Sequence, residues 1–450
     1  MTNSNVIVVG SGVAGLSAAV RLSLAGRHVT LVERNQYLGG RTRSFKDETT
    51  GDVVDNGQHL LMGCYHDTIE YLQLIGSRHL AILQPFLHID FADVATGQRS
   101  SLHASGLPAP AHVFTGLLQL SSIPIADRIR LVNVGIELLR LSARKEQLLR
   151  SLTVEEWLKK LGQSEKVRTY LWDVIAIGSL NDSPSNVSAL PFVRVLRSAF
   201  FGHRTNASML IPKVGLSELL VDPAARLISE KGGQVRLGAA AKSVRIDNGR
   251  ATGILLESGE SLDADDVILA VPHFAASSLL ADSEVSQKAS ALHSSPIITV
   301  NLWFDRPVME PEFVALLNGR MQWAFNRSKM LHTGGSGQYI ACVISGAGSY
   351  VDFEKDQLVK VAVDDLSAVF PAARAAVVRH SLVLKEMRAT FSPTPAAEKI
   401  RTSIASRIPH LHIAGDWTNT GLPATIEGAV MSGRKAAEAL LLDEYAVGDD

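Results

Sequence analysis

The sequence is poor in cysteine, in net charge and in uninterrupted apolar stretches. Its 450 residues include only two cysteines, Cys64 and Cys342, so no disulfide framework is expected and a reducing cytoplasm fits. The formal net charge of −1 gives no indication of a nucleic-acid-binding surface, and no metal site is expected. The composition is that of a globular protein long enough for two or three domains.

No stretch of the sequence predicts a membrane-spanning helix. Residues 100–126 lack Asp, Glu, Lys and Arg, but they contain Pro108, Pro110, Pro124 and several polar side chains. A spanning helix is apolar and unbroken, so this segment is a poor candidate. The apolar N-terminus has no basic residue before Arg21, which argues against a signal peptide. The expected location is therefore cytoplasmic.

The first residues predict a strand, a glycine-rich turn, a helix and a second strand. Val6–Val9 and Val29–Val32 are β-branched runs typical of buried parallel strands, and Leu16–Ala25 has helical apolar spacing. The intervening GSGVAG has the GxGxxG spacing of a dinucleotide-binding turn. In such a turn the first glycine allows the tight bend, the second lets the backbone approach a pyrophosphate, and the third lets the helix pack on the strand.

An acidic residue completes this pattern. Glu33 closes the second strand, 18 residues after Gly15. A carboxylate there accepts hydrogen bonds from ribose hydroxyls and disfavours a 2′-phosphate, while free N–H groups at the helix start attract the pyrophosphate. We therefore predict a nucleotide cofactor held by Gly10, Gly12, Val13, Ala14, Gly15, Glu33 and Arg34.

Amphipathic helices are predicted between residues 65 and 205. Asp127–Leu149 is expected to form one helix with Ile129, Val132, Ile136 and Leu139 on one face. Five basic residues decorate the same segment: Arg128, Arg130, Arg140, Arg144 and Lys145. A basic amphipathic helix suits an anionic membrane surface, so peripheral contact with the inner membrane through 127–149 is a hypothesis. A core helix with a solvated basic face is the alternative.

A wide apolar pocket is predicted from residues 170–190. Trp172, Ile175 and Leu180 are the candidate lining residues. Asp173 stands among them and would become a proton donor if it were buried without a partner, because burial raises the pKa of a carboxyl. An aspartate facing solvent or paired with an arginine is the alternative.

The remaining sequence predicts a return of the chain to the cofactor domain and a second, separate sheet. Strands are expected at Gln234–Leu237, Ser243–Asp247, Ala251–Glu257, Asp266–Pro272 and Leu411–Ala414, followed by a helix to about Leu442. Asn248-Gly249 predicts a hairpin turn. Ile297–Phe304 and Tyr339–Ile344 are assigned to a separate sheet. The expected division is a cofactor domain from 1–64, 206–285 and 396–450, and a substrate domain from 65–205 and 286–395.

The run Gly39-Gly40-Arg41-Thr42 resembles the second signature of the flavin amine oxidase and carotenoid desaturase superfamily. This resemblance implies an α/β fold, with a Rossmann-type FAD-binding domain, an α+β substrate domain and a helical lid. It further implies FAD as the cofactor, and we expect it to be bound without a covalent link because neither cysteine lies in the C-terminal stretch, with a histidyl link as the open alternative. The implied contacts are Gly39, Gly40 and Arg41 at the pyrophosphate, Gly57 and His59 along the flavin, Val244 at the adenine, Gly415 and Asp416 near the ribityl chain, and Ala424, Thr425 and Ile426 at the start of a helix that faces the flavin.

Longer segments resemble one family within that superfamily, the squalene-associated FAD-dependent desaturases, which act as hydroxysqualene dehydroxylases in bacterial hopanoid or squalene synthesis. The matching segments include DNGQHLL, WDVIAIGSLN, EMRATF and GDWTNTGLPATIEGA. The resemblance implies an isoprenoid lipid substrate and reductive loss of its allylic hydroxyl, with the electron donor left open. His59 and Asp173 are the candidate proton donors, although the family more usually has proline near the position of Asp173.

Three alternatives remain open at this point. A carotenoid-type desaturase would use the same fold in the oxidative direction. An amine oxidase favours two aromatic rings before the flavin, whereas the C-terminal signature offers only Trp417. A non-catalytic protein that binds flavin and isoprenoid lipid belongs to a different functional class.

Overall fold

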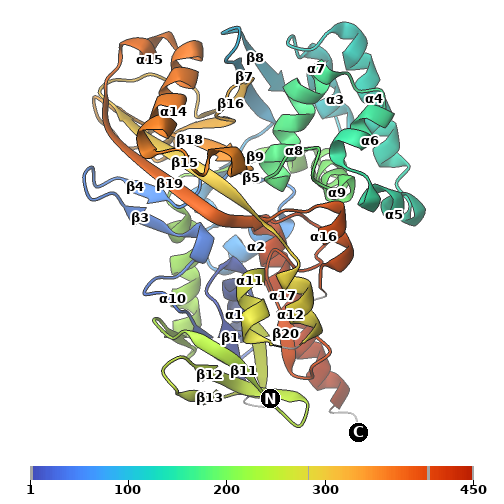
Figure 1. The fold of residues 1–450 in the computed structure, drawn as a ribbon, viewed down its shortest axis with the longest axis vertical. Coiled ribbons are helices and arrows are strands. Elements are labelled where there is room, and N and C mark those ends of the chain that lie inside the picture. Colours follow the sequence, from blue (N-terminus) through green and yellow to red (C-terminus); the bar gives the residue numbers. More distant parts are fainter. Residues whose placement is uncertain (1–3, 282, 403–405, 448–450) are drawn as a thin grey trace.

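Two lobes make up the molecule in the computed structural model, which describes residues 4–281, 283–402 and 406–447. A parallel sheet and its helices form the lower lobe in Figure 1. A second, larger sheet and a block of helices form the upper lobe, side by side. The chain passes between the lobes several times, so each lobe is assembled from distant segments.

The lower lobe is centred on a five-stranded parallel sheet in the order β10-β2-β1-β14-β20. Its strands are short, and β1, β14 and β20 inside the sheet or at its C-terminal edge are almost entirely buried, as expected of a parallel sheet, whereas the edge strand β10 is more exposed. Their bounds are β1 Asn5–Val9, β2 His28–Val32, β10 Gln234–Arg236, β14 Asp266–Leu269 and β20 Leu411–Ile413. This sheet confirms the predicted α/β class.

Helices cover one face of the parallel sheet, and they come from four parts of the chain: α1 Val13–Leu24, α2 His66–Leu74, α10 Asp222–Glu230 and α17 Ile426–Val447. Ser17 donates a hydrogen bond to the Val430 carbonyl (2.9 Å), which ties α1 to α17. The sequence assigns residues 66–74 to the helical block, but Tyr71 and Leu72 of α2 are fully buried in this core.

A small antiparallel sheet and two helices cover the other face of the parallel sheet. They are β11 Ala241–Asp247, β12 Arg250–Leu256, β13 Ser261–Asp263, α11 His273–Leu279 and α12 Glu284–Ser290. Asn248 and Gly249 both have left-handed φ angles, 51° and 80°. Positive φ at both positions is the requirement of the predicted tight hairpin turn.

A seven-stranded, mainly antiparallel sheet forms the upper lobe, in the order β19-β15-β18-β17-β16-β7-β8. The bounds are β7 His88–Asp93, β8 Arg99–His103, β15 Ser294–Phe304, β16 Phe313–Leu317, β17 Trp323–Asn326, β18 Gln338–Ser345 and β19 Val378–Phe391. Side chains alternate along β15: Ile298 and Val300 pack under α14 Lys355–Val369, and Ile297 faces the opposite side. That opposite side is turned towards the helical block.

The helical block lies at the outer edge of the upper lobe (Figure 1). It contains α3 Ala111–Gln119, α4 Ile125–Leu139, α5 Ala143–Ser151, α6 Val154–Lys160, α8 Asp173–Leu180 and α9 Ala189–Phe200. The single helix predicted for 127–149 is wrong, because the chain breaks after Leu139 and Ser142 caps a new helix by accepting from the Lys145 N–H. No helix within the described residues has the length and hydropathy needed to cross a bilayer.

Short strands and a buried ion pair connect the two lobes. β3 Ser44–Lys46 pairs with β4 Val53–Asp55, and β9 Met209–Pro212 pairs with both β5 Leu61–Met62 and β6 Ala81–Leu83. Asp55 accepts a 2.7 Å hydrogen bond from Arg327, and both side chains are almost fully buried. The segment between β4 and β5 is therefore held at both ends.

Candidate functional site

One cavity of about 1010 Å³ runs between the lobes. Its walls come from the glycine-rich turn after β1, the segment between β4 and β5, the end of β19, and the start of α17. The rest of its wall comes from α8, α9 and the inner face of the large sheet. Segments that are remote in sequence thus line one cavity.

The nucleotide end of the cavity is built from backbone. Gly10 has φ 101°, which only glycine adopts easily, and a Cβ at Gly15 would lie 1.9 Å from the Gly10 carbonyl oxygen. Gly15 thus allows close packing and does not itself line the cavity. Gly12 caps α1 without a side-chain hydrogen bond, and a Cβ there would meet nothing within 4 Å. The uncapped N–H groups and open approach fit a pyrophosphate.

Glu33 organises this turn from the end of β2. Its Oε2 accepts hydrogen bonds from the Ser11 N–H (3.1 Å) and the Ser11 hydroxyl (2.7 Å). Its Oε1 accepts from the N–H and the side-chain amide of Asn35 (2.9 and 2.7 Å). The carboxylate lines the cavity, and a ribose contact by Glu33 stays a prediction.

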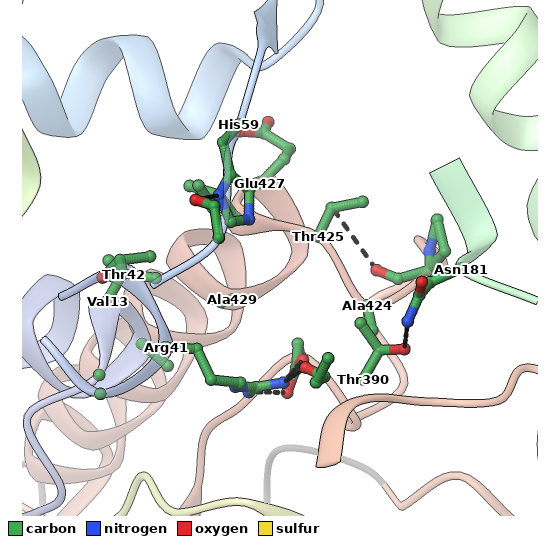
Figure 2. A pocket seen from close by; sticks show the side chains of 18 of the residues that line it. Val13, Arg41, Thr42, His59, Asn181, Thr390, Ala424, Thr425, Glu427 and Ala429 are labelled. Carbon is green, nitrogen blue, oxygen red and sulfur yellow. Dashed lines mark hydrogen bonds and ion pairs between the residues drawn. The ribbon is translucent and has the colours of Figure 1, made fainter. Parts of the chain in front are cut away.

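Arg41, labelled in Figure 2, forms a bidentate pair with Asp416 in the cavity wall. Nη1 and Nη2 of Arg41 donate to the two carboxylate oxygens at 2.7 and 2.9 Å. The pair joins residues 375 positions apart. Arg41 also donates to the Ala389 carbonyl, so it links the GGRT turn, the end of β19 and the C-terminal signature. Gly39, Gly40 and Gly415 line the cavity beside this pair.

His59 faces the cavity as a neutral ring. Its Nδ1–H donates to the Gly57 carbonyl at 2.8 Å, since a carbonyl oxygen only accepts. Burial lowers the pKa of His59 below its usual value. At neutral pH the remaining ring nitrogen is therefore an acceptor, which argues against the predicted role of His59 as proton donor.

The start of α17 supplies Ala424, Thr425 and Ile426 to the cavity wall, as the resemblance implies. Glu427, which the sequence does not single out, lines the cavity beside them. Its carboxylate accepts from the N–H groups of Asp67 and Thr68 (3.0 and 2.9 Å) and from the Thr68 hydroxyl (2.7 Å). Burial raises the pKa of Glu427 to about 7, against the effect of these hydrogen bonds.

Val244 is not part of the cavity wall. Val244 belongs to β11, and its side chain is buried in the core. The cavity is lined by the residues just before it, Ala239 to Lys242. A register shift between Ala241 and Ser243 interrupts the β11–β12 pairing at this point. The predicted adenine contact of Val244 therefore has no support from the cavity, and the cavity wall nearby is formed by residues towards the beginning of the strand.

Apolar side chains line the other end of the cavity, which we call the chamber. It is bordered by β7, β8, α8, α9 and the large sheet, and its larger side chains are Leu87, Phe91, Leu171, Ile175, Leu196, Phe200, Met209, Trp323 and Phe325. Among the described residues from 87–102, 171–209 and 297–345 that line it, none is charged. The chamber suits an apolar ligand.

Only one of the three predicted chamber residues lines it. Ile175 does, but Trp172 and Leu180 are buried in the core behind, where Trp172 donates to Gln163 (3.0 Å). Asp173 does not line the cavity either, so it is removed as a proton-donor candidate although burial raises its pKa. A wide π-type turn at Arg168–Trp172 precedes α8. Such a turn departs from the 3.6-residue spacing of an α-helix, so that spacing does not predict which side chains of this segment face the chamber.

Comparisons with known proteins agree on one family. The family model for flavin containing amine oxidoreductases matches residues 13–441. The chain is 30% identical to a hydroxysqualene dehydroxylase of Rhodopseudomonas palustris, over 98% of this chain and 99% of that one. It is 24% identical to a 15-cis-phytoene desaturase of Solanum lycopersicum, over 98% and 79% of the two chains. Cyclohexylamine oxidase from Brevibacterium oxydans has the same fold, with a TM-score of 0.74, 19% identity, and coverage of 98% and 100%.

Proposed function

Because the chain belongs to the flavin-containing amine oxidoreductase family and is an FAD-dependent oxidoreductase, we propose that it reductively removes the allylic hydroxyl of hydroxysqualene to give squalene. One observation carries the proposal: the nucleotide end of the cavity opens directly into an uncharged apolar chamber. The relatives named hydroxysqualene dehydroxylase support this choice of substrate.

Residues of the chain fit the cofactor at one end of the cavity. The uncapped start of α1 and the open approach at Gly12 would hold the pyrophosphate of FAD, and Gly57, His59 and the start of α17 would border the flavin. When bound in its reduced form, FAD supplies a hydride for carbon and a proton for the leaving oxygen, which departs as water. The N-terminal end of α17 favours negative charge nearby.

The chamber contributes binding and protection. Apolar walls hold a hydrocarbon chain through buried area and exclude water from the reacting carbon. Exclusion matters because an allylic cation would be captured by water and return to the alcohol. At about 1010 Å³, the whole cavity is at the top of the range of about 300–1,000 Å³ usual for ligand pockets, as expected for two large ligands.

Anaerobic product analysis tests the proposal. Dithionite-reduced holoenzyme is mixed with hydroxysqualene without oxygen, and flavin absorbance and extracted lipid are followed together. Flavin reoxidation with matching formation of squalene is the expected result. Reduced flavin that stays inert with hydroxysqualene contradicts the proposal.

Oxidative desaturation is the second candidate, favoured by the similarity to phytoene desaturases. The same chamber would hold a carotenoid precursor. Oxidised holoenzyme incubated with phytoene distinguishes the two: new conjugated double bonds and reduced flavin support desaturation. Unchanged phytoene, together with the squalene result above, excludes it.

We further propose that α4 rests on an anionic membrane surface. The face predicted from sequence is exposed, with Ile129 at 62% and Leu139 at 68% exposure, while Leu131 and Leu138 on the opposite face are buried. Arg140 and Arg144 follow without an ion pair in the described structure. An apolar face flanked by free cations is the pattern of an interfacial helix.

A further inference from the structure

Two residues that have no role so far, each from a different sequence motif, meet at the cavity wall. Asn181 ends the WDVIAIGSLN segment, directly after α8, and Thr390 belongs to EMRATF, near the end of β19. The Asn181 side-chain amide donates a 2.9 Å hydrogen bond to the Thr390 hydroxyl oxygen. Both residues line the cavity.

The orientation of the Asn181 amide is fixed by its surroundings. Its Oδ1 accepts from the Gly346 N–H at 2.9 Å, so Oδ1 and Nδ2 cannot exchange places without losing this bond. The backbone of Asn181 has a left-handed φ of 54°, and its carbonyl accepts from the Ser295 hydroxyl at 2.6 Å. Asn181 therefore presents a hydrogen, and not an oxygen, to Thr390.

This arrangement determines where the Thr390 hydroxyl hydrogen points. Because the Thr390 oxygen accepts from Asn181, its own hydrogen is directed elsewhere, and the described residues offer it no acceptor. Thr390 is half-buried and lines the cavity, so that hydrogen is available to a ligand. Accepting one hydrogen bond polarises the hydroxyl and strengthens it as a donor.

Thr390 lies where the nucleotide end meets the chamber. Figure 2 shows Thr390 and Asn181 next to Ala424 and Thr425, at the start of α17. The adjoining Ala389 carbonyl accepts from Arg41, and the chamber residue Ile175 lies on α8, the helix that Asn181 follows. A hydroxyl on the lipid has to lie at this junction if its carbon is to be reduced.

We propose that the Thr390 hydroxyl donates a hydrogen bond to the hydroxyl oxygen of the lipid alcohol, and that Asn181 is the positioning residue for Thr390. The inference rests on the proposed function. As the carbon–oxygen bond breaks, its electron pair goes to oxygen, and the donor stabilises the charge that develops there. Thr390 keeps its hydrogen. Reduced FAD bound at the nucleotide end would supply the hydride to carbon and the proton with which the oxygen leaves as water, so that the flavin would be oxidised and the alcohol reduced.

Three holoenzyme variants test the role of Thr390. T390V removes the hydroxyl at nearly constant shape, T390S keeps it, and T299V is the matched control. Thr299 is buried on the neighbouring strand β15, outside the cavity wall, and its hydroxyl has no hydrogen-bond partner among the described residues. Loss of one transition-state donor lowers rates by about 10²-fold, so we expect T390V to lose about that much in kcat/KM with hydroxysqualene. The kcat/KM of T390S should lie within a few fold of the wild-type value, and that of T299V should equal it.

The binding preference for the alcohol over the hydrocarbon is a second readout. It would not change if Thr390 had only a structural role. Flavin absorbance of the oxidised holoenzyme is titrated with hydroxysqualene and with squalene, which lacks the hydroxyl. Wild type should bind the alcohol more tightly, whereas T390V should lose this preference and keep its affinity for squalene. N181G, which tolerates the left-handed φ, should reduce the preference as well, and the T390V/N181G pair should add little beyond T390V.

The outcomes separate this inference from the proposed function. If wild type does not convert hydroxysqualene, the proposed function fails first. If wild type converts it and T390V retains the rate and the preference for the alcohol, only the role of Thr390 is overturned. Weakened FAD binding in T390V with an unchanged preference for the alcohol would also overturn it, because Thr390 would then serve the cofactor.

Discussion

The two ends of the cavity are constructed on different principles. The nucleotide end depends on backbone N–H groups, left-handed glycines and hydrogen-bonded carboxylates at fixed positions, such as Glu33 and Asp416. The chamber depends on apolar side chains whose contribution is area and exclusion of water, and whose identities are largely interchangeable. Substitutions that add a single carbon atom should therefore disable the nucleotide end. The chamber should tolerate every substitution except one that changes the polarity of its wall.

Glycine substitutions should give the largest effects and test the nucleotide end. In G15A the new Cβ would lie 1.9 Å from the Gly10 carbonyl, so α1 has to move; we expect lost FAD and an apoprotein destabilised by about 1–3 kcal/mol. In G12A the Cβ has free space, so FAD affinity should fall more than about tenfold with an unchanged apoprotein. Flavin titration and thermal unfolding of apoprotein distinguish the two. Equal destabilisation of both apoproteins would contradict the assigned roles.

A charge in the chamber should have the next largest effect. I175D places a carboxylate among apolar walls, where an unpaired polar group costs several kcal/mol, so we expect kcat/KM to fall at least about 100-fold near pH 8. FAD content should stay at wild-type level, because Ile175 lies outside the nucleotide end. I175V is the control and should stay within a few fold. Loss of FAD in I175D would show that the two ends are not separable.

Glu427 should give a smaller, pH-dependent effect at the border of the two ends. Burial raises its pKa to about 7 in the folded protein, above the unfolded value of about 4.3. Its favourable contribution is thus present below the unfolded pKa and is lost as the pH rises through the folded pKa. E427Q cannot ionise, so the free energy of unfolding of wild type relative to that of E427Q should fall between about pH 5 and about pH 8. The melting temperatures of both proteins at both pH values measure this change. A difference in melting temperature that stays constant would refute the raised pKa.

Substitutions on the exposed face of α4 should have the smallest effect on catalysis. Replacing Ile129 and Leu139 by serine removes two largely exposed apolar side chains from the surface of α4. We expect weaker co-sedimentation with anionic vesicles and unchanged turnover of detergent-solubilised substrate. The control is L148S, an exposed leucine on α5. Vesicle binding that survives the double substitution would place any membrane contact elsewhere.

The nucleotide end was predictable because its chemistry is local. Gly10, Gly12, Gly15 and Glu33 follow one another along a strand, turn, helix and strand, and nothing distant alters their geometry. The parallel sheet follows from the same pattern, since its inner strands β1 and β14 are apolar and buried on both faces. The sequence therefore predicts the α/β class and most of the residues that border the nucleotide end.

The chamber was not predictable in the same detail, because the segment made of the π-type turn and α8, residues 168–180, is apolar on two sides. Leu171 and Ile175 face the chamber, while Trp172 and Leu180 face the core, and both sets have helical spacing. Only the packing of the helix against its neighbours decides between them. The pairing of Asn181 with Thr390 is likewise invisible in sequence, since the two are 209 residues apart and meet only through tertiary structure.

The bond between Arg41 and Asp416 has a consequence for biogenesis. Its partners are separated by 375 residues, and the part of the cavity wall that they form together is incomplete until both are in place. A ribosome that has delivered the glycine-rich turn still has most of the polypeptide to synthesise before Asp416 emerges. FAD should consequently be captured late, after translation has passed α17, and nascent chains stalled earlier should bind no flavin.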